Sequence, residues 1–214
     1  MKPYYQDNLV TLYNADCKIV IEELGRFECL VTDPPYGINE AAGKNKSRGR
    51  LATATDYGNS NWDCKPIDQK LLDALISKSN KAAIFGGNYY NLPASSCWLI
   101  WDKDNGNTDF ADCEMVWTNL KKAVRLKKYR WQGMLQQYAG ERKEVRFHPT
   151  QKPLAVMKWV LDQVKAGESV LDPFAGSGTT LIAARDYGIS SVGIEREEKY
   201  CEVIANRLEQ GVLF

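Results

Sequence analysis

The sequence predicts an α/β protein with a mostly parallel sheet and helices on both faces. Its 214 residues and 24.2 kDa fit one domain of ordinary size. With 44% hydrophobic and 26% charged residues, the composition is typical of a globular chain with one packed core. Short β-rich runs alternate with segments of helical periodicity, which indicates parallel strands joined by helices. We therefore expect a single domain over residues 1–214.

Each expected strand is a short β-rich run, and each expected helix has apolar residues at helical spacing. The strands are expected at Leu9–Tyr13, Glu28–Thr32, Lys81–Phe85, Cys97–Trp101, Ser169–Leu171 and Ser191–Ile194. The helices are expected at Asp16–Leu24, Ile67–Ser77, Pro153–Lys165, Ser177–Tyr187 and Glu197–Gln210. Gly188 directly follows the fourth helix and provides its stop. No internal repeat or linker divides the chain.

The charge balance and the cysteines exclude several kinds of protein. With 28 lysines and arginines against 27 acids, the chain is not a uniformly basic polyanion binder, although a local basic face is compatible with this balance. The six cysteines form no C-x-x-C pair and His148 is the one histidine, so we expect no metal site and buried thiols. The N-terminus lacks a signal-peptide core and no apolar run approaches about 18 residues, so we expect a cytoplasmic protein without a membrane segment.

Two polar stretches interrupt the alternation. Residues 37–61 are glycine-rich, and loops of this length are usually functional. Residues 121–146 carry nine lysines and arginines against two glutamates, with Tyr129, Trp131 and Tyr138 interleaved. A charge run usually means a solvated surface, but two basic segments with aromatics in a near-neutral chain indicate nucleic acid as a partner. The cations that we expect to contact it are Lys44, Lys46, Arg48 and Arg50 in the first stretch and Lys127, Lys128 and Arg130 in the second.

The motif VLDPFAGSGTT at 170–180 follows an expected strand and opens an expected helix. Glycines at such a turn let a ligand approach the backbone and leave helix N–H groups free. Glu195 ends the next expected strand, where a carboxylate can accept both hydroxyls of a ribose. The dinucleotide fingerprint G-x-G-x-x-G is incomplete because residue 181 is Leu, so the motif alone only modestly favours a nucleoside-type cofactor over a plain glycine turn.

The motif VTDPPYG at 31–37 follows another expected strand. Pro34 and Pro35 stiffen the backbone and lack N–H donors, so their carbonyls are expected to face outward unpaired. The Asp33 carboxylate and the Pro34 carbonyl can accept hydrogen bonds from an exocyclic amine, while Tyr36 stacks on the ring that carries it. A turn stiffened by proline would explain the prolines but not the whole Asp-Pro-Pro-Tyr segment, which favours a site that activates a nucleobase amine.

These motifs resemble those of S-adenosylmethionine-dependent DNA amino-methyltransferases, in the permuted group where the catalytic motif precedes the cofactor motif. Asp33, Pro34, Pro35 and Tyr36 match the catalytic tetrad of that family. The resemblance assigns cofactor contacts to Asp16, Thr150, Lys152, Asp172, Phe174, Ala175, Gly176, Ser177, Gly178 and Glu195. Within the segment His148–Pro153, it implies that His148 orders the loop and that Lys152 meets the cofactor's carboxylate.

The resemblance also implies a Rossmann-like, seven-stranded sheet with a reversed final hairpin. The base-binding half would span 9–102 and the cofactor half 148–214, with a short target-recognition region at 119–147. Both motifs would lie at carboxyl ends of strands, where open α/β sheets bind ligands. Because the recognition region is short, a long target sequence is not expected, and the 37–61 stretch is a candidate to share recognition.

The implied reaction is methyl transfer from S-adenosylmethionine to an amine of a base flipped out of double-stranded DNA. Asp at the head of the tetrad favours adenine N6, and cytosine N4 remains open. An inactive DNA-binding relative, an enzyme acting on RNA or a glutamine side chain, and a nicotinamide-dependent oxidoreductase are further alternatives. Many relatives dimerise, so a homodimer is possible, but no dimer face is identified. The segment from Phe85 to Asn88 is expected to border the base pocket, whereas Trp98, Trp101 and Trp117 could line the pocket or lie buried in the sheet.

Overall fold

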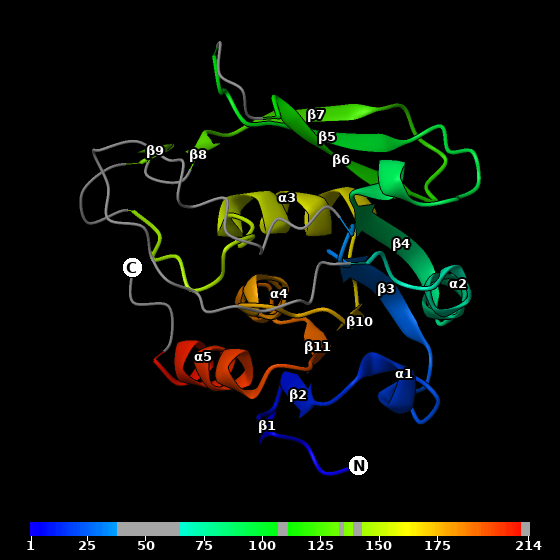
Figure 1. Ribbon diagram of the computed structural model, residues 1–214, viewed down its shortest axis with the longest axis vertical. Helices are drawn as coiled ribbons and strands as arrows, with labels where there is room; N and C mark the ends of the chain where they lie inside the picture. The colour runs from blue at the N-terminus through cyan, green and yellow to red at the C-terminus, as the bar shows by residue number, and fades with distance from the viewer. Residues whose placement is uncertain (38–64, 107–110, 133–134, 139–142, 211–214) are drawn as a thin grey trace.

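One nine-stranded sheet dominates the computed structural model, which describes residues 1–37, 65–106, 111–132, 135–138 and 143–210 (Figure 1). The strand order is β1-β2-β11-β10-β3-β4-β6-β5-β7. The strands are β1 (Tyr5–Gln6), β2 (Val10–Asn14), β3 (Phe27–Thr32), β4 (Ser79–Phe85), β5 (Trp98–Asp102), β6 (Cys113–Thr118), β7 (Arg125–Lys128), β10 (Ser169–Asp172) and β11 (Ser190–Glu195). Two further strands, β8 (Trp131–Gln132) and β9 (Leu135–Gln136), pair separately.

The seven strands from β2 to β5 form the expected α/β sheet with one reversed strand. Strand β6 runs antiparallel to both β4 and β5, whereas β2, β11, β10, β3 and β4 are mutually parallel. The sheet exceeds seven strands because β1 and β7 pair at its two edges. The predicted fold class is therefore confirmed, with an additional short strand at each edge.

Helices cover both faces of the sheet, so the molecule has three layers. Figure 1 shows α3, α4 and α5 on one side and α1 and α2 on the other. These helices are α1 (Cys17–Val20), α2 (Gln69–Ser77), α3 (Leu154–Val164), α4 (Thr179–Asp186) and α5 (Glu198–Glu209). Among the described residues, no helix has the length and hydropathy needed to cross a membrane.

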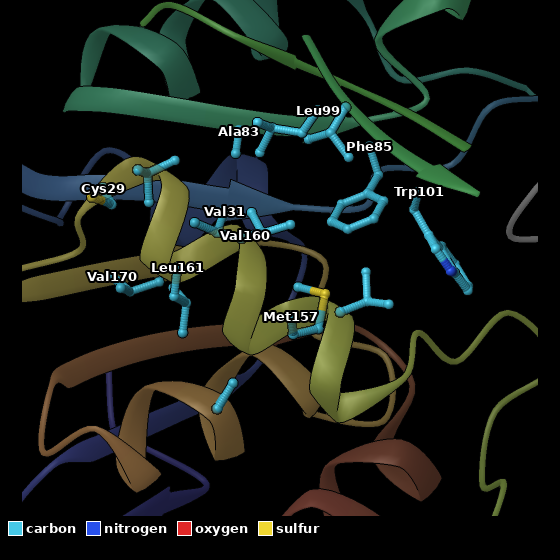
Figure 2. Packing of buried hydrophobic residues seen from close by; sticks show 14 of the residues in the cluster. Cys29, Val31, Ala83, Phe85, Leu99, Trp101, Met157, Val160, Leu161 and Val170 are labelled. Carbon is cyan, nitrogen blue, oxygen red and sulfur yellow. The ribbon is translucent and has the colours of Figure 1, made fainter. Parts of the chain in front are cut away.

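The strand register explains why both faces are buried. Leu30 on β3 pairs with Ala82 on β4, and both pack towards α2. The next pair, Val31 and Ala83, points to the opposite face and packs against α3. Figure 2 shows Met157, Val160 and Leu161 of α3 meeting these strands.

The helix ends follow local chemistry. Asp68 caps α2, since its side chain accepts a hydrogen bond from Lys70 N at 2.9 Å. Gly188, with φ +69°, terminates α4 as predicted, and Gly188 N donates to Arg185 O at 2.9 Å. The helix expected at Asp16–Leu24 is shorter, because regular helix ends at Val20 and turns follow.

Sequence reasoning missed strands β6 and β7, and it misjudged two aromatic residues. Strand β7 lies in the basic stretch, pairs with β5 and belongs to the main sheet. Tyr129 and Trp131 follow it and are 9% and 7% exposed in the core beside α3, so these two aromatics of the basic stretch are not available to contact nucleic acid. Tyr138 is exposed. The structural reason is that Trp101 Nε1 donates to Tyr129 O at 2.8 Å, which ties this segment to β5.

Candidate active site at the carboxyl ends of the strands

The two sequence motifs open into one cavity of about 430 Å³. Asp33 follows β3, Asp172 ends β10 and Glu195 ends β11, so all three lie at the carboxyl edge of the parallel strands. The predicted residues that line the cavity are Asp16, Asp33, Pro35, Thr150, Lys152, Asp172, Phe174, Ala175, Gly176, Ser177 and Glu195. Pro34, Tyr36 and Gly178 lie outside its lining.

The glycine loop between β10 and α4 is held in shape by Asp172. Asp172 Oδ1 accepts hydrogen bonds from Thr32 Oγ1 at 2.8 Å and from Phe174 N at 3.2 Å. Burial raises the pKa of Asp172 to about 6. Gly178 has φ +78°, and a Cβ there would lie 2.8 Å from Ile204 Cγ1, so only glycine fits at the start of α4.

Glu195 is a half-buried carboxylate fixed by the backbone. Its Oε2 accepts from Gly176 N and its Oε1 from Glu197 N, each at 2.8 Å. Burial raises the pKa of Glu195 to about 7, although these two N–H groups oppose the shift. A carboxylate held in this way presents its remaining lone pairs to hydroxyl donors.

Asp16 lies beside Glu195 because β2 and β11 are neighbours. Asp16 caps α1, and its Oδ1 accepts from Lys18 N at 2.9 Å. Ala15 N donates to Glu195 O at 3.0 Å, which joins the two strand ends. Phe174 packs partly buried between the same elements. One end of the cavity therefore combines an aromatic ring with two carboxylates.

At the other end, the oxygens of Asp33 are held by two side chains. Tyr36 Oη donates to Asp33 Oδ1, and Lys152 Nζ lies 2.5 Å from Asp33 Oδ2. Each oxygen still has a lone pair for a further donor. Burial raises the pKa of Asp33 above its usual value, and the Lys152 ammonium opposes that shift.

The Tyr36 ring is held by the segment after β4, and the residues from Phe85 to Asn88 do not line the cavity themselves. It stacks on Tyr89 with centroids 5.0 Å apart and planes at 14°. A Cβ at Gly86 would collide with the ring at 2.1 Å, so glycine is required there. Tyr90 Oη donates to Pro35 O, so the expectation of two unpaired proline carbonyls is wrong for Pro35. No described residue donates to the Pro34 carbonyl.

His148 and Thr150 shape the segment beside the glycine loop. Burial lowers the pKa of His148 to about 3, so its imidazole is neutral and too weak a base to accept a proton at neutral pH. The ring meets Tyr200 edge-on at 4.4 Å, and His148 Nδ1 accepts from Thr150 N at 3.3 Å. These contacts agree with a role in ordering the loop.

Lys152 has partners that sequence reasoning did not anticipate. Its ammonium pairs with Asp33 and, at 3.2 Å, with Glu114 Oε2 on β6. Burial alone would lower the pKa of Lys152, but the carboxylates of Asp33 and Glu114 raise it above its usual value. Glu114 was missed because one carboxylate in a weakly patterned strand carries no local signal.

None of the predicted nucleic-acid contacts that the structure describes lines the cavity. Four others lie outside the described residues, namely Lys44, Lys46, Arg48 and Arg50. Lys128 and Arg130 are exposed and pair with Asp104 at 2.7 and 2.5 Å. Lys127 is half-buried on β7. Trp98, Trp101 and Trp117 lie in or beside the sheet core and outside the cavity lining.

The mostly parallel sheet with one reversed strand, together with a glycine loop and an Asp-Pro-Pro-Tyr segment at one cavity, defines a methyltransferase of the class I fold. A family model described as DNA methylase matches residues 77–207, more than half of the chain. The chain therefore belongs to the DNA methylase family, and the resemblance to DNA amino-methyltransferases is confirmed.

Individual relatives cover nearly the whole chain. The Type II methyltransferase M.HinfI of Haemophilus influenzae is 33% identical, covering 98% of this chain and 71% of the relative. The Type II methyltransferase M2.LlaDCHI of Lactococcus lactis subsp. cremoris is 25% identical, covering 100% of this chain and 94% of the relative.

Solved structures show the same fold. A complex of M1.HpyAVI with SAM superposes with a TM-score of 0.59 and 20% identity, covering 94% of this chain and 99% of the other. The cytosine-N4-specific PvuII DNA methyltransferase superposes with a TM-score of 0.56 and 15% identity, covering 98% and 96%.

Proposed function

We propose that this chain transfers a methyl group from S-adenosylmethionine to the N6 amine of an adenine flipped out of double-stranded DNA at a short specific site. The observation that carries the proposal is that Asp33 and Glu195 line one cavity. The Asp33 carboxylate can bind the acceptor amine and the Glu195 carboxylate can bind the ribose of the cofactor, so both reactants would be held in the same cavity.

The residues at the Glu195 end fit the cofactor. The two oxygens of Glu195 are already oriented by Gly176 N and Glu197 N, so they can accept both ribose hydroxyls. Asp16 is placed to accept from an adenine amine, and the glycine loop permits close approach of the methionine portion. When bound, S-adenosylmethionine supplies an electrophilic methyl group on a sulfonium sulfur.

The residues at the Asp33 end fit the acceptor amine. The Asp33 carboxylate and the Pro34 carbonyl accept its N–H groups, which draws the nitrogen lone pair out of conjugation with the ring. Fixed acceptors also stabilise positive charge that develops on this nitrogen. The amine loses one proton on methylation, and Asp33 is placed to receive it.

The support for adenine is the Asp at the head of the tetrad. Cytosine N4 is the second candidate, because the PvuII enzyme, which is cytosine-N4-specific, has a similar fold. A flipped cytosine offers the same exocyclic amine geometry, so the cavity accommodates the same chemistry on either base.

The test is mass spectrometry of nucleosides from unmethylated plasmid incubated with the protein and S-adenosylmethionine. N6-methyladenine is the expected product. N4-methylcytosine would overturn the choice of base, and no methylated nucleoside would overturn the proposal. Asp33→Ala should reduce the rate on the order of 10²–10³-fold while calorimetric cofactor affinity stays nearly unchanged. Asp73→Ala, which removes an exposed carboxylate on α2, is the matched control.

A further inference from the structure

Four side chains of alternating charge form a chain from the β5–β6 hairpin to the catalytic motif. Lys103 Nζ lies 2.6 Å from Glu114 Oε1, and Glu114 Oε2 lies 3.2 Å from Lys152 Nζ. Lys152 Nζ in turn lies 2.5 Å from Asp33 Oδ2. Two cations and two anions therefore alternate, with Asp33 at the end that lines the cavity.

Burial makes Lys152 dependent on both of its carboxylate partners. Its side chain is 8% exposed, and an ammonium in such surroundings is stable only when it is paired. Besides the two carboxylates, the aromatic rings of Phe85 and Tyr36 lie near the ammonium, with centroids 5.3 and 5.9 Å away. Without Glu114, Asp33 would be its one remaining ion-pair partner among the described residues.

The backbone of the reversed strand fixes the position of Glu114. Glu114 pairs in register with Trp101 of β5, and Lys103 N donates to Asp112 O at 2.9 Å. Lys103 Nζ lies 5.2 Å from the Trp101 ring centroid, so it is also held against this hairpin. The carboxylate therefore reaches Lys152 from a rigid element and does not itself line the cavity.

We propose that Glu114 is a positioning residue, which holds the Lys152 ammonium on Asp33 so that the Asp33 carboxylate stays oriented towards the acceptor amine. This inference rests on the proposed function, since it concerns the residue assigned to that amine. It also gives Lys152 a task other than meeting the cofactor's carboxylate. Glu114 acts only through Lys152, so its loss should slow methyl transfer without weakening cofactor binding.

The test compares Glu114→Gln with wild type in kcat, in the KM for DNA, and in cofactor Kd by calorimetry. Loss of Lys152 orientation should lower kcat on the order of 10²-fold, as for other small misplacements at a reacting centre. The cofactor Kd and the KM for DNA should stay nearly constant, because Glu114 does not line the cavity and acts only through Lys152.

Glu28→Gln is the matched control, since Glu28 also pairs with a lysine, Lys81 at 2.6 Å, but lies remote from the cavity lining. It should leave kcat and the KM for DNA unchanged. A Glu114→Gln protein with wild-type kcat would overturn the inference. So would a lowered kcat accompanied by a weaker cofactor Kd or a higher KM for DNA, which indicates a merely structural role.

A second variant covers the case in which Glu114→Gln fails to fold because Lys103 is left unpaired. Lys103→Gln combined with Glu114→Gln removes that ion pair as a neutral unit. The inference predicts that this double variant folds and remains slow. Recovery of wild-type kcat would show that Glu114 only neutralises Lys103. Absence of methylated nucleosides with the wild-type protein is a different result, which overturns the proposed function first.

Discussion

The Asp33 carboxylate has one hydrogen-bond partner inside its own motif and another that is distant in the sequence. Tyr36 is three residues away and donates to one carboxylate oxygen, so the motif itself contains that contact. Lys152 is 119 residues away and holds the other oxygen. Both contacts favour an ionised carboxylate against the cost of burial. At the residue scale, the state of Asp33 is decided by a distant segment.

Glu195 gives a pH-dependent prediction for cofactor binding. Its pKa is about 7, so the carboxylate that we propose to accept two ribose hydroxyls becomes protonated as the pH falls below 7. Affinity should therefore be nearly fully present above pH 8 and fall about fivefold between pH 7 and 6, with a slope that approaches the limit of about tenfold per pH unit for one linked proton at still lower pH. Calorimetry across this range measures the effect.

Glu195→Gln is the control for this pH dependence. The amide cannot ionise, so its weaker cofactor affinity should be nearly independent of pH over the same range. If the variant kept the wild-type slope, the titrating group would be another one, with Asp172 and its pKa of about 6 as the next candidate.

At the element scale, the basic charge of β7 fits two roles, that of a protected edge strand and that of a contact to DNA phosphates. One side of β7 pairs with β5, and no strand of the described residues pairs with its other side. Basic side chains are common on such edges, since they discourage pairing with other sheets. The same cations can meet phosphates, so the charge of β7 by itself does not distinguish these two roles.

Charge reversal on β7 separates the two roles. Lys127→Glu together with Lys128→Glu should weaken DNA binding and lower the slope of log K against log salt by about 1–2, corresponding to one or two lost phosphate contacts. Fluorescence anisotropy with a labelled duplex at several salt concentrations measures this slope. Lys2→Glu, near the opposite edge of the sheet, should leave it unchanged. An unaltered slope in the double variant would identify β7 as a solvated edge only.

For the whole molecule, the sheet brings together segments that are distant in the chain. The cavity lining combines residues 15–35, 65–71, 148–157 and 172–200, so each layer contributes to one site. A ligand that bridges these segments binds the folded state alone. Cofactor binding and global stability are therefore linked.

This linkage predicts a thermal shift. S-adenosylmethionine at about 100 times its Kd should add about 2.7 kcal/mol to the free energy of unfolding, which corresponds to a Tm rise of about 5–10 °C for a chain of this size. Differential scanning calorimetry measures the shift. Glu195→Ala, which removes the proposed ribose contact, should shift much less at the same ligand concentration. An equal shift would contradict that contact.

Local patterns in the sequence predicted most of the helices and strands whose apolar residues recur with a clear periodicity. The strands before Asp33 and Glu195 and the glycine loop at Gly176 could be located because burial on both faces and helix initiation leave short-range signals. Strand β6 and strand β7 left no such signal. The first is reversed and carries Glu114, and the second is basic at a sheet edge.

By itself, the sequence determined the fold class, the two motifs and their places at the ends of strands. Only the tertiary structure decided that Lys152 pairs with Asp33, that Glu114 supports this pair, and that Tyr129 and Trp131 are buried. The physical reason is that periodicity and turn chemistry act over a few residues. Ion pairs and core contacts instead depend on which distant strands become neighbours, and that is settled when the whole sheet forms.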